Sequence, residues 1–262
     1  MIELRNITKT YNSGTDNEVK IFKKFNLKID KGEFVSVVGS NGSGKTSLLN
    51  CICGDIKLDE GSIFINDIDI TRLQNYQRYK YIGRVYQNPA NGTCQDMTIL
   101  ENIALADNKG KKFNLMKCIN KKRLGFYKEK LSELGLGLEN KLNTKVSSLS
   151  GGQRQAVALI MSTITPIDVL ILDEHTAALD AKTAKIIMKL TDRIVRENNL
   201  TTIMVTHNLK YAVQYGNRII ALRDGKIKLD INGKNKSKVT NTEILDVFEE
   251  EKIFDKIYDS II

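Results

Sequence analysis

Residues 34–46, FVSVVGSNGSGKT, decide the fold of this chain. The first five form a compact run that favours a buried strand. Gly39, Gly42 and Gly44 then mark a short turn, and Leu48 and Leu49 continue in a helical pattern. Since this segment matches the spacing G-x-x-x-x-G-K-[ST], we predict a strand, a glycine-rich loop and a helix in direct succession.

This succession is chemically suited to phosphate. Glycines let the backbone curl until successive N–H groups face one anion, and the start of a helix adds a favourable dipole. Lys45 is expected to reach the β- and γ-phosphates of a nucleotide, and the Thr46 hydroxyl to ligate Mg²⁺. An accidental glycine-rich turn is the alternative, which the flanking strand and helix disfavour. We therefore predict that ATP and Mg²⁺ bind at Gly39, Ser40, Asn41, Gly42, Ser43, Gly44, Lys45, Thr46 and Ser47.

A carboxylate for the metal is expected in residues 169–174, VLILDE. The apolar run predicts a buried strand that ends at Asp173, and nucleotidases with this phosphate loop hold Mg²⁺ with such an acid. Glu174 comes next and can orient or polarise the attacking water. A solvated acidic pair at a strand end is the alternative, and the presence of the phosphate loop at 39–46 disfavours it.

The rest of the N-terminal half predicts strands and then helices. Residues 3–30 alternate short apolar and polar stretches around a turn-rich interruption at 12–17, which is typical of antiparallel strands. Residues 61–70, GSIFINDIDI, predict another short strand pair. From 98 to 163 apolar residues recur at helical spacing. We interpret that stretch as a helical subdomain inserted into the fold.

The C-terminal half returns to an α/β pattern. Buried strands are predicted at 167–172 and 201–205, with a helix at 181–198 between them and the β-rich fragments IIALRDG and KIKLDING after them. Buried strands that alternate with helices imply a parallel sheet covered on both faces. The fold class is therefore α/β. The loop at 39–46 resembles that of the P-loop NTPases, which implies a RecA-like core with an N-terminal antiparallel β subdomain and a helical insertion.

The last part of the chain differs in composition. From residue 232 the sequence becomes polar and Lys-rich, and Thr240 and Glu243 then fit the pattern of a helix start. We predict an ATPase domain over 1–231 and a short helical extension over 232–262.

Length and composition limit the class of protein. The chain has 262 residues, of which 41% are hydrophobic and 27% charged, as in an ordinary globular protein. Its apolar runs are far shorter than the roughly 20 residues of a membrane-spanning helix. The N-terminus has no apolar segment of signal-peptide length. These features predict a cytoplasmic protein that does not cross a bilayer by itself.

Cysteines and net charge carry little functional signal. Cys51, Cys53, Cys94 and Cys118 lack the spacing of a zinc site, and we expect them to be reduced thiols. The formal net charge of +9 is compatible with nucleic acid, an anionic membrane surface or a small anion as partner. Because the basic residues are spread along the chain, a solvated basic surface is the simpler interpretation.

Residues 149–155, LSGGQRQ, narrow the class further, because LSGGQ resembles the signature motif of ABC ATPases. The motif lies shortly before VLILDE and opens a predicted helix. The Ser150 hydroxyl and the N–H groups of Gly151 and Gly152, with Gln153 beside them, can form a second phosphate cradle. A glycine helix cap is the alternative.

The resemblance extends over about residues 2–230 and implies roles for four more residues. Gln87 resembles the glutamine that touches Mg²⁺ or water and senses the membrane partner. Asp180, in ALD, resembles the D-loop acid, and His207 resembles the switch histidine that contacts the γ-phosphate. Tyr11 resembles the aromatic residue that stacks on adenine, with a strand-edge tyrosine as the alternative. The family also implies a head-to-tail homodimer in which ATP lies between residues 39–46 of one copy and 150–153 of the other.

His175 departs from the family, where proline usually follows the glutamate. This variant, with the stretch NGTCQDMTILENIALA after Gln87, resembles importer ATPases that pair with a permease and an extracellular substrate-binding lipoprotein and are linked to aromatic amino acids. A neutral replacement at a turn is the alternative for His175.

The resemblance favours an energy-coupling subunit that drives import through a separate permease at the inner face of the membrane. An ATPase of an export or lipoprotein-release system is the first alternative. A soluble ABC ATPase that acts on nucleic acid or ribosomes is the second, and it is disfavoured because the chain has neither two cassettes nor coiled-coil arms. We expect no nucleic-acid partner.

Overall fold

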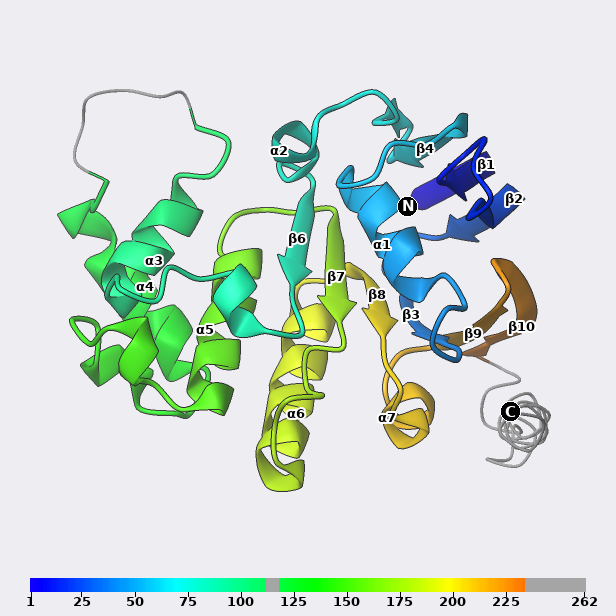
Figure 1. Ribbon diagram of the computed structural model, residues 1–262. Coiled ribbons are helices and arrows are strands. Elements are labelled where there is room, and N and C mark those ends of the chain that lie inside the picture. Colours follow the sequence, from blue (N-terminus) through cyan, green and yellow to red (C-terminus); the bar gives the residue numbers. More distant parts are fainter. Residues whose placement is uncertain (112–117, 234–262) are drawn as a thin grey trace. The chain divides into compact units, whose positions relative to one another are not determined.

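The computed structural model describes residues 1–111 and 118–233 (Figure 1). The chain divides into two compact units. Unit 1 consists of Met1–Thr71 and the segment from Ile203 onward, and unit 2 consists of Arg72–Thr202. The helix predicted from Thr240 and Glu243 lies outside the described residues, and the predicted domain boundaries stay predictions.

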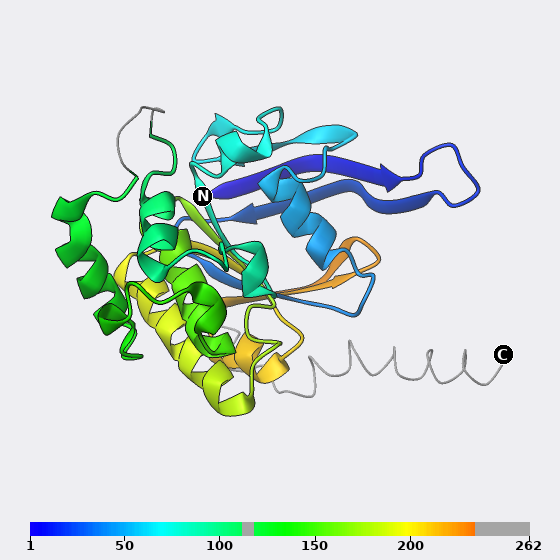
Figure 2. The same ribbon diagram turned by 60° about the vertical axis from the view of Figure 1, so that its left-hand side comes forward.

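Unit 1 begins with an antiparallel sheet of strand order β2-β1-β4-β5. The strands are β1 (Ile2–Tyr11), β2 (Val19–Ile29), β4 (Glu60–Ile65) and β5 (Ile68–Asp69). Figure 2 shows β1 and β2 side by side, and their register pairs Ile2 with Ile29. The alternation in residues 3–30 and the strand pair in 61–70 are thus confirmed.

Unit 1 also contains the strand that leads into the phosphate loop. This strand is β3, and it lies between β9 and β8 in the order β10-β9-β3-β8. Strand β3 is parallel to β9, and β9 is antiparallel to β10. The strands are β3 (Phe34–Val38), β8 (Thr201–Val205, in unit 1 from Ile203), β9 (Arg218–Arg223) and β10 (Lys226–Asn232). Helix α1 (Lys45–Cys53) follows β3, and α7 (Leu209–Gln214) follows β8.

Unit 2 combines two parallel strands with helices. Strands β6 (Ile82–Val85) and β7 (Val169–Asp173) pair with Ile82 opposite Val169. The helices are α2 (Asn75–Arg78), α3 (Ile99–Asp107), α4 (Leu124–Ser132), α5 (Gly151–Thr163) and α6 (Ala181–Glu197). Short 3₁₀ turns occupy Pro89–Asn91, Lys121–Arg123, Leu138–Asn140 and Val146–Ser148.

Side-chain caps explain where the main helices of unit 2 begin. Thr98 and Glu101 form a capping box at the start of α3, and Ser150 and Gln153 form another at the start of α5. Asp180 accepts hydrogen bonds from the N–H groups of Lys182 and Thr183 at the start of α6. Each cap satisfies N–H groups that have no partner within the helix, so these short polar residues fix the helix starts.

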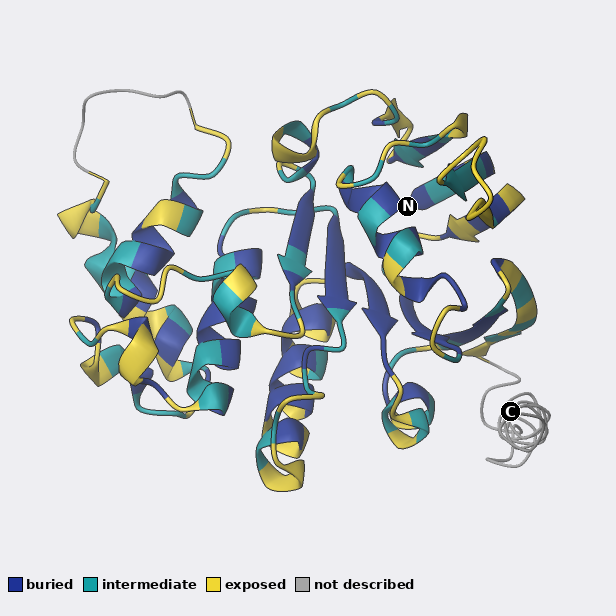
Figure 3. Cartoon of the chain, viewed as in Figure 1, coloured by how far each residue is buried: buried dark blue, intermediate teal, exposed yellow. Residues whose placement is uncertain are grey.

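Burial follows the predicted strands. All five residues of β3 and of β8 are buried, as are the first four of β7 (Figure 3). Such runs suit strands of a parallel sheet that is covered on both faces. None of the helices in the described ranges is long and apolar enough to span a bilayer.

Candidate functional site

The phosphate loop of unit 1 depends on close backbone approach. A Cβ at Gly39 would lie 2.3 Å from the Leu222 carbonyl oxygen and 2.6 Å from Ser43 Oγ. Gly42 and Gly44 have φ of 82° and 101°, values that glycine adopts without steric cost. The pattern G-x-x-x-x-G therefore has a steric cause here that is separate from any bound phosphate.

Lys45 lies over this loop. Its ammonium group donates to the carbonyl oxygens of Gly39 at 2.7 Å and Ser40 at 2.6 Å, and the residue is 5% exposed. These contacts place a buried positive charge against the loop that the sequence assigns to phosphate. A buried cation at this loop favours an anionic ligand such as phosphate.

The start of α1 fits a bound anion. No side chain among the described residues caps this helix, whereas α3, α5 and α6 are capped by Thr98, Ser150 and Asp180. Ser43 Oγ is buried and has no hydrogen-bond partner within the described ranges. Uncapped N–H groups and a buried hydroxyl without a partner are groups that phosphate oxygens can satisfy.

Tyr11 reaches the same part of unit 1. Its hydroxyl oxygen lies 3.4 Å from Ser47 Oγ in α1, and the Lys9 ammonium lies 5.7 Å from its ring centroid. The end of β1 thus places an aromatic ring beside the first turn of the phosphate helix. This position is compatible with the predicted contact with adenine.

Replacing Tyr11 by Ala is expected to raise the Michaelis constant for ATP about tenfold with a modest loss of turnover, because a stacked base contributes roughly 1–3 kcal/mol. Tyr11→Phe keeps the ring and serves as the control, since only the hydroxyl contact with Ser47 is lost. Steady-state ATPase assays give both constants, and an unchanged constant in Tyr11→Ala would remove Tyr11 from the site.

In unit 2, Asp173 ends β7 as predicted and forms an ion pair with Arg84 of β6. The distance from Arg84 Nη2 to Asp173 Oδ2 is 2.8 Å, and the two side chains are 5% and 14% exposed. Glu174 follows with φ of 46°, an uncommon conformation for a residue with a Cβ. The Ala177 N–H donates to its carbonyl oxygen, which closes the turn after the strand.

The predicted signature motif and D-loop lie together in unit 2. A Cβ at Gly152 would lie 2.2 Å from Thr183 Cγ2, and one at Gly151 would lie 3.4 Å from Leu179 Cδ2. Hydrogen bonds from the side chain and backbone of Thr183 hold the pKa of Asp180 below its usual range. Gly152 therefore has a packing role, whereas Gly151 has room for a side chain.

Gln87 lies two residues after Val85, the end of β6, and is exposed. Its neighbour Tyr86 is fixed from two sides: the Gln155 amide of α5 donates to the Tyr86 carbonyl oxygen at 3.0 Å, and the Tyr79 hydroxyl lies 3.1 Å from the Tyr86 hydroxyl. The segment that carries Gln87 is thus attached to the helix that begins at the signature motif.

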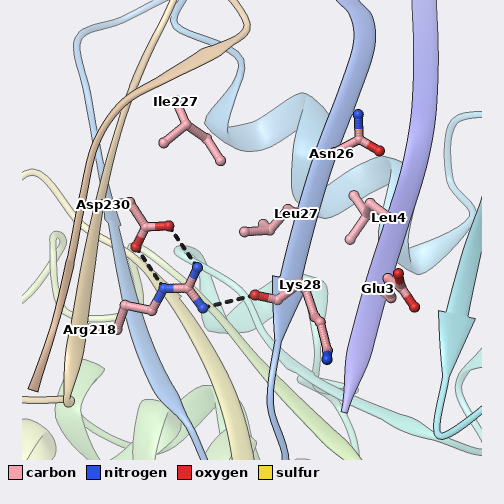
Figure 4. Close-up of a pocket in the computed structure, with 8 residues that line it drawn as sticks. All are labelled: Glu3, Leu4, Asn26, Leu27, Lys28, Arg218, Ile227 and Asp230. Carbon is pink, nitrogen blue, oxygen red and sulfur yellow. Dashed lines mark hydrogen bonds and ion pairs between the residues drawn. The ribbon is translucent and has the colours of Figure 1, made fainter.

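A separate pocket of about 220 Å³ in unit 1 lies beside β2, β9 and β10 (Figure 4). Arg218 donates to both carboxylate oxygens of Asp230 at 2.7 Å and to the Lys28 carbonyl oxygen at 2.8 Å. The ion pair with Asp230 raises the pKa of Arg218. This arginine links β9 and β10 to β2, and none of the predicted site residues lines the pocket.

Comparison with known proteins shows the family of this chain. The family model described as ABC transporter matches residues 22–177, more than half of the chain. The chain belongs to the ABC transporter family. Within this family it is an ATPase cassette.

Two curated relatives match over nearly their full length. The tyrosine transport ATP-binding protein of Clostridioides difficile (strain R20291) is 47% identical over 249 residues, which cover 95% of this chain and 99% of the relative. The phosphonates import ATP-binding protein of Lactococcus lactis subsp. cremoris (strain SK11) is 33% identical, with 94% and 97% covered.

A solved ABC cassette shares the fold. The ATP-binding cassette MJ0796 of Methanocaldococcus jannaschii, a dimer in a post-hydrolysis state with ADP and phosphate, matches with a TM-score of 0.75 and 34% identity. The match covers 88% of this chain and 98% of that cassette. The predicted α/β fold class of the ABC ATPases is confirmed.

His175, the departure from the ABC pattern, is a buried link to α6. It is 2% exposed, and its Nε2 lies 3.2 Å from Thr191 Oγ1. Since the Thr191 hydroxyl donates its proton to the Ile187 carbonyl oxygen at 2.9 Å, it accepts from His175, so Nε2 carries the imidazole proton. Burial lowers the pKa of His175 from 6.5 to about 4. The imidazole is therefore neutral at physiological pH and ties the residue after Glu174 to the helix.

This burial predicts that the domain loses stability in acid. The native state disfavours the protonated imidazole. The contribution of neutral His175 to the free energy of unfolding is therefore complete above pH 6.5 and is lost as pH falls towards about 4. The loss has a ceiling of about 3 kcal/mol. Urea unfolding at several pH values should show a smaller acid loss in His175→Pro.

The ATPase rate of His175→Pro supplies the functional control. Because His175 is buried and neutral, we expect the pH profile of ATP hydrolysis above pH 6 to be the same in both proteins. A displaced profile would mean that His175 takes part in the chemistry and would contradict the structural role.

The predicted site residues fall into two groups, one in each unit. The phosphate loop, Tyr11 and His207 belong to unit 1, and His207 is exposed and lies two residues after the end of β8. The second group, in unit 2, contains Gln87, Ser150, Gly151, Gly152, Gln153, Asp173, Glu174 and Asp180. The assignment of both groups to one ATP site stays a prediction that rests on the ABC resemblance.

Sequence reasoning missed Arg84. A charged residue within the apolar strand IGRVY is the signal that could have found it, because a buried arginine is rarely without a partner. The partner itself could not be inferred, since the pairing of β6 with β7 joins residues 89 positions apart.

Proposed function

We propose that this chain is the ATP-hydrolysing subunit of an importer, coupling ATP binding and hydrolysis to transport through a separate permease. An aromatic amino acid such as tyrosine is the proposed cargo, delivered by an extracellular substrate-binding lipoprotein. The observation that carries this proposal is the 47% identity to the tyrosine transport ATP-binding protein over 95% of the chain. The subunit would sit at the inner face of the membrane, held there by the permease.

We also propose a head-to-tail homodimer. The solved relative MJ0796 is dimeric, and two features of this chain support the same arrangement. The phosphate loop of unit 1 and the Ser150 cap of unit 2 each begin a helix with small residues, so each can offer N–H groups to a phosphate. ATP would lie between the loop of one copy and the signature motif of the other.

Each of the following site residues has a proposed role in ATP hydrolysis. Lys45 neutralises the phosphates, and Glu174 orients and polarises the water that attacks the γ-phosphate, with His207 in contact with that phosphate. Thr46, Gln87 and Asp173 are the residues that would hold Mg²⁺, since hydroxyl, amide and carboxylate oxygens suit this ion. Mg²⁺, when bound, supplies positive charge to the β- and γ-phosphates.

A membrane pull-down tests the transport assignment. A tagged Glu174→Gln form should retain ATP and trap the closed complex. Membranes from the source cell are solubilised in the presence of this variant, ATP and Mg²⁺, and the co-purifying proteins are identified. The expected result is a multi-span permease with a substrate-binding lipoprotein, whose ligand is then found by screening with amino acids. An export permease, ribosomes or nucleic acid would overturn the importer proposal and leave the ATPase assignment standing.

A further inference from the structure

The carboxylate of Asp173 is engaged by a neighbouring arginine within unit 2. Arg84 Nη2 donates to Oδ2 at 2.8 Å, and both side chains are largely shielded from solvent. Such a pair is strongly coupled electrostatically, because removal of one partner leaves a poorly solvated charge. The second oxygen, Oδ1, is not used in this contact.

The strand register explains the contact. Arg84 lies opposite Ile171 in the parallel pair β6 and β7. Since side chains two residues apart share a face, Asp173 lies one step further along the face of Ile171. A long side chain at residue 84 can therefore reach the carboxylate at the end of β7.

Arg84 is itself held in place. Its guanidinium carbon lies 4.5 Å from the centroid of the Tyr86 ring. The Ser162 hydroxyl of α5 donates to the backbone carbonyl oxygen of Arg84 at 2.8 Å. On the opposite face of the strand, a Cβ at Gly83 would lie 2.3 Å from the Ser162 carbonyl oxygen, so α5 packs tightly there. The guanidinium is thus pre-oriented by an aromatic ring and by a fixed backbone.

We propose that Arg84 is a positioning residue that holds Oδ2 of Asp173 and, through its charge, raises the Mg²⁺ concentration needed for nucleotide binding. The inference rests on the proposed function, since it takes Asp173 as a residue that holds the metal. A guanidinium beside the carboxylate repels a cation that binds the same group, so it weakens Mg²⁺ binding while it fixes the geometry. The contacts of Tyr86 also connect this pair to the segment that carries Gln87.

Mg²⁺-dependent binding of a fluorescent ADP tests the proposal without hydrolysis. In Arg84→Met, which keeps the length of the side chain and removes the charge, the Mg²⁺ concentration for half-maximal binding should fall roughly three- to tenfold. Arg84→Lys keeps the charge and should stay near the wild-type value. Arg123→Met is the matched control, because Arg123 also pairs with a carboxylate, Asp107, and lies over an aromatic ring in the same unit.

A second measurement reports the ion pair without metal or nucleotide. Thermal unfolding in EDTA should show a lower Tm for Arg84→Met than for the wild type. Most of this loss should disappear when Asp173→Asn is already present, because the neutral side chain no longer needs a counter-charge. Equal losses in both backgrounds would show that Arg84 acts through packing alone.

The outcomes separate this inference from the proposed function. An Mg²⁺ midpoint in Arg84→Met that equals or exceeds the wild-type value would overturn the role of Arg84 and leave Asp173 as the metal carboxylate. Wild-type binding that does not respond to Mg²⁺ would overturn the metal site itself, and the inference would fall with it.

Discussion

Lys45→Met is expected to reduce ATP hydrolysis roughly 100- to 1000-fold, the range found when a preorganised charge-stabilising donor is removed. Lys45 is 5% exposed, and its ammonium group donates to the loop carbonyl oxygens of Gly39 and Ser40. A bound triphosphate would take over those hydrogen bonds, and no other lysine or arginine of the loop 39–46 can replace them. We expect nucleotide affinity to fall along with turnover, since the charge acts in the ground state as well.

Equilibrium binding of a fluorescent ATP and a steady-state ATPase assay measure the two effects. Lys31→Met is the control, because it removes an exposed lysine of the same unit. Circular dichroism with thermal unfolding in the absence of nucleotide shows whether the variant folds. A folded Lys45→Met that binds and hydrolyses ATP like the wild type would disprove the assignment of the loop at residues 39–46.

The sequence alone was sufficient for features that depend on local chemistry. The run FVSVV, the glycines and Lys45 predicted a strand, loop and helix, and β3 and α1 have those positions. The same holds for the strand that ends at Asp173 and for the helices predicted after the signature motif and over 181–198. In each case neighbouring residues determine the backbone, so a short window contains the needed information.

Contacts between distant segments could not be predicted from short stretches of sequence. The Arg84–Asp173 ion pair depends on which strand pairs with β6, and the link from His175 to Thr191 depends on how α6 packs against the loop after β7. Gly152 was assigned to phosphate from its motif, although its close contact with Thr183 is a second reason for glycine there. Long-range packing thus adds roles to residues that a motif had already explained.

Glu174→Gln is expected to lower ATP turnover roughly 100- to 10,000-fold while ATP binding is retained, because the amide cannot accept the proton of the attacking water. The backbone supports this role: Glu174 has φ of 46°, which costs a residue with a side chain about 1 kcal/mol or more. The turn closed by Ala177 and the buried His175 fix that conformation. Glu197→Gln, an exposed change in α6, should leave turnover intact.

The slow variant also makes the proposed dimer measurable. With hydrolysis blocked, ATP should convert Glu174→Gln from monomer to dimer in size-exclusion chromatography, and ADP should not. Adding Gly151→Asp should abolish the dimer, because the new carboxylate would face the phosphates of the partner's ATP. Gly151 is the better choice over Gly152, since its Cβ would meet Leu179 Cδ2 at 3.4 Å and an acid suits the first turn of α5. An ATP-dependent dimer that survives Gly151→Asp would show that residues 150–153 do not contact the nucleotide.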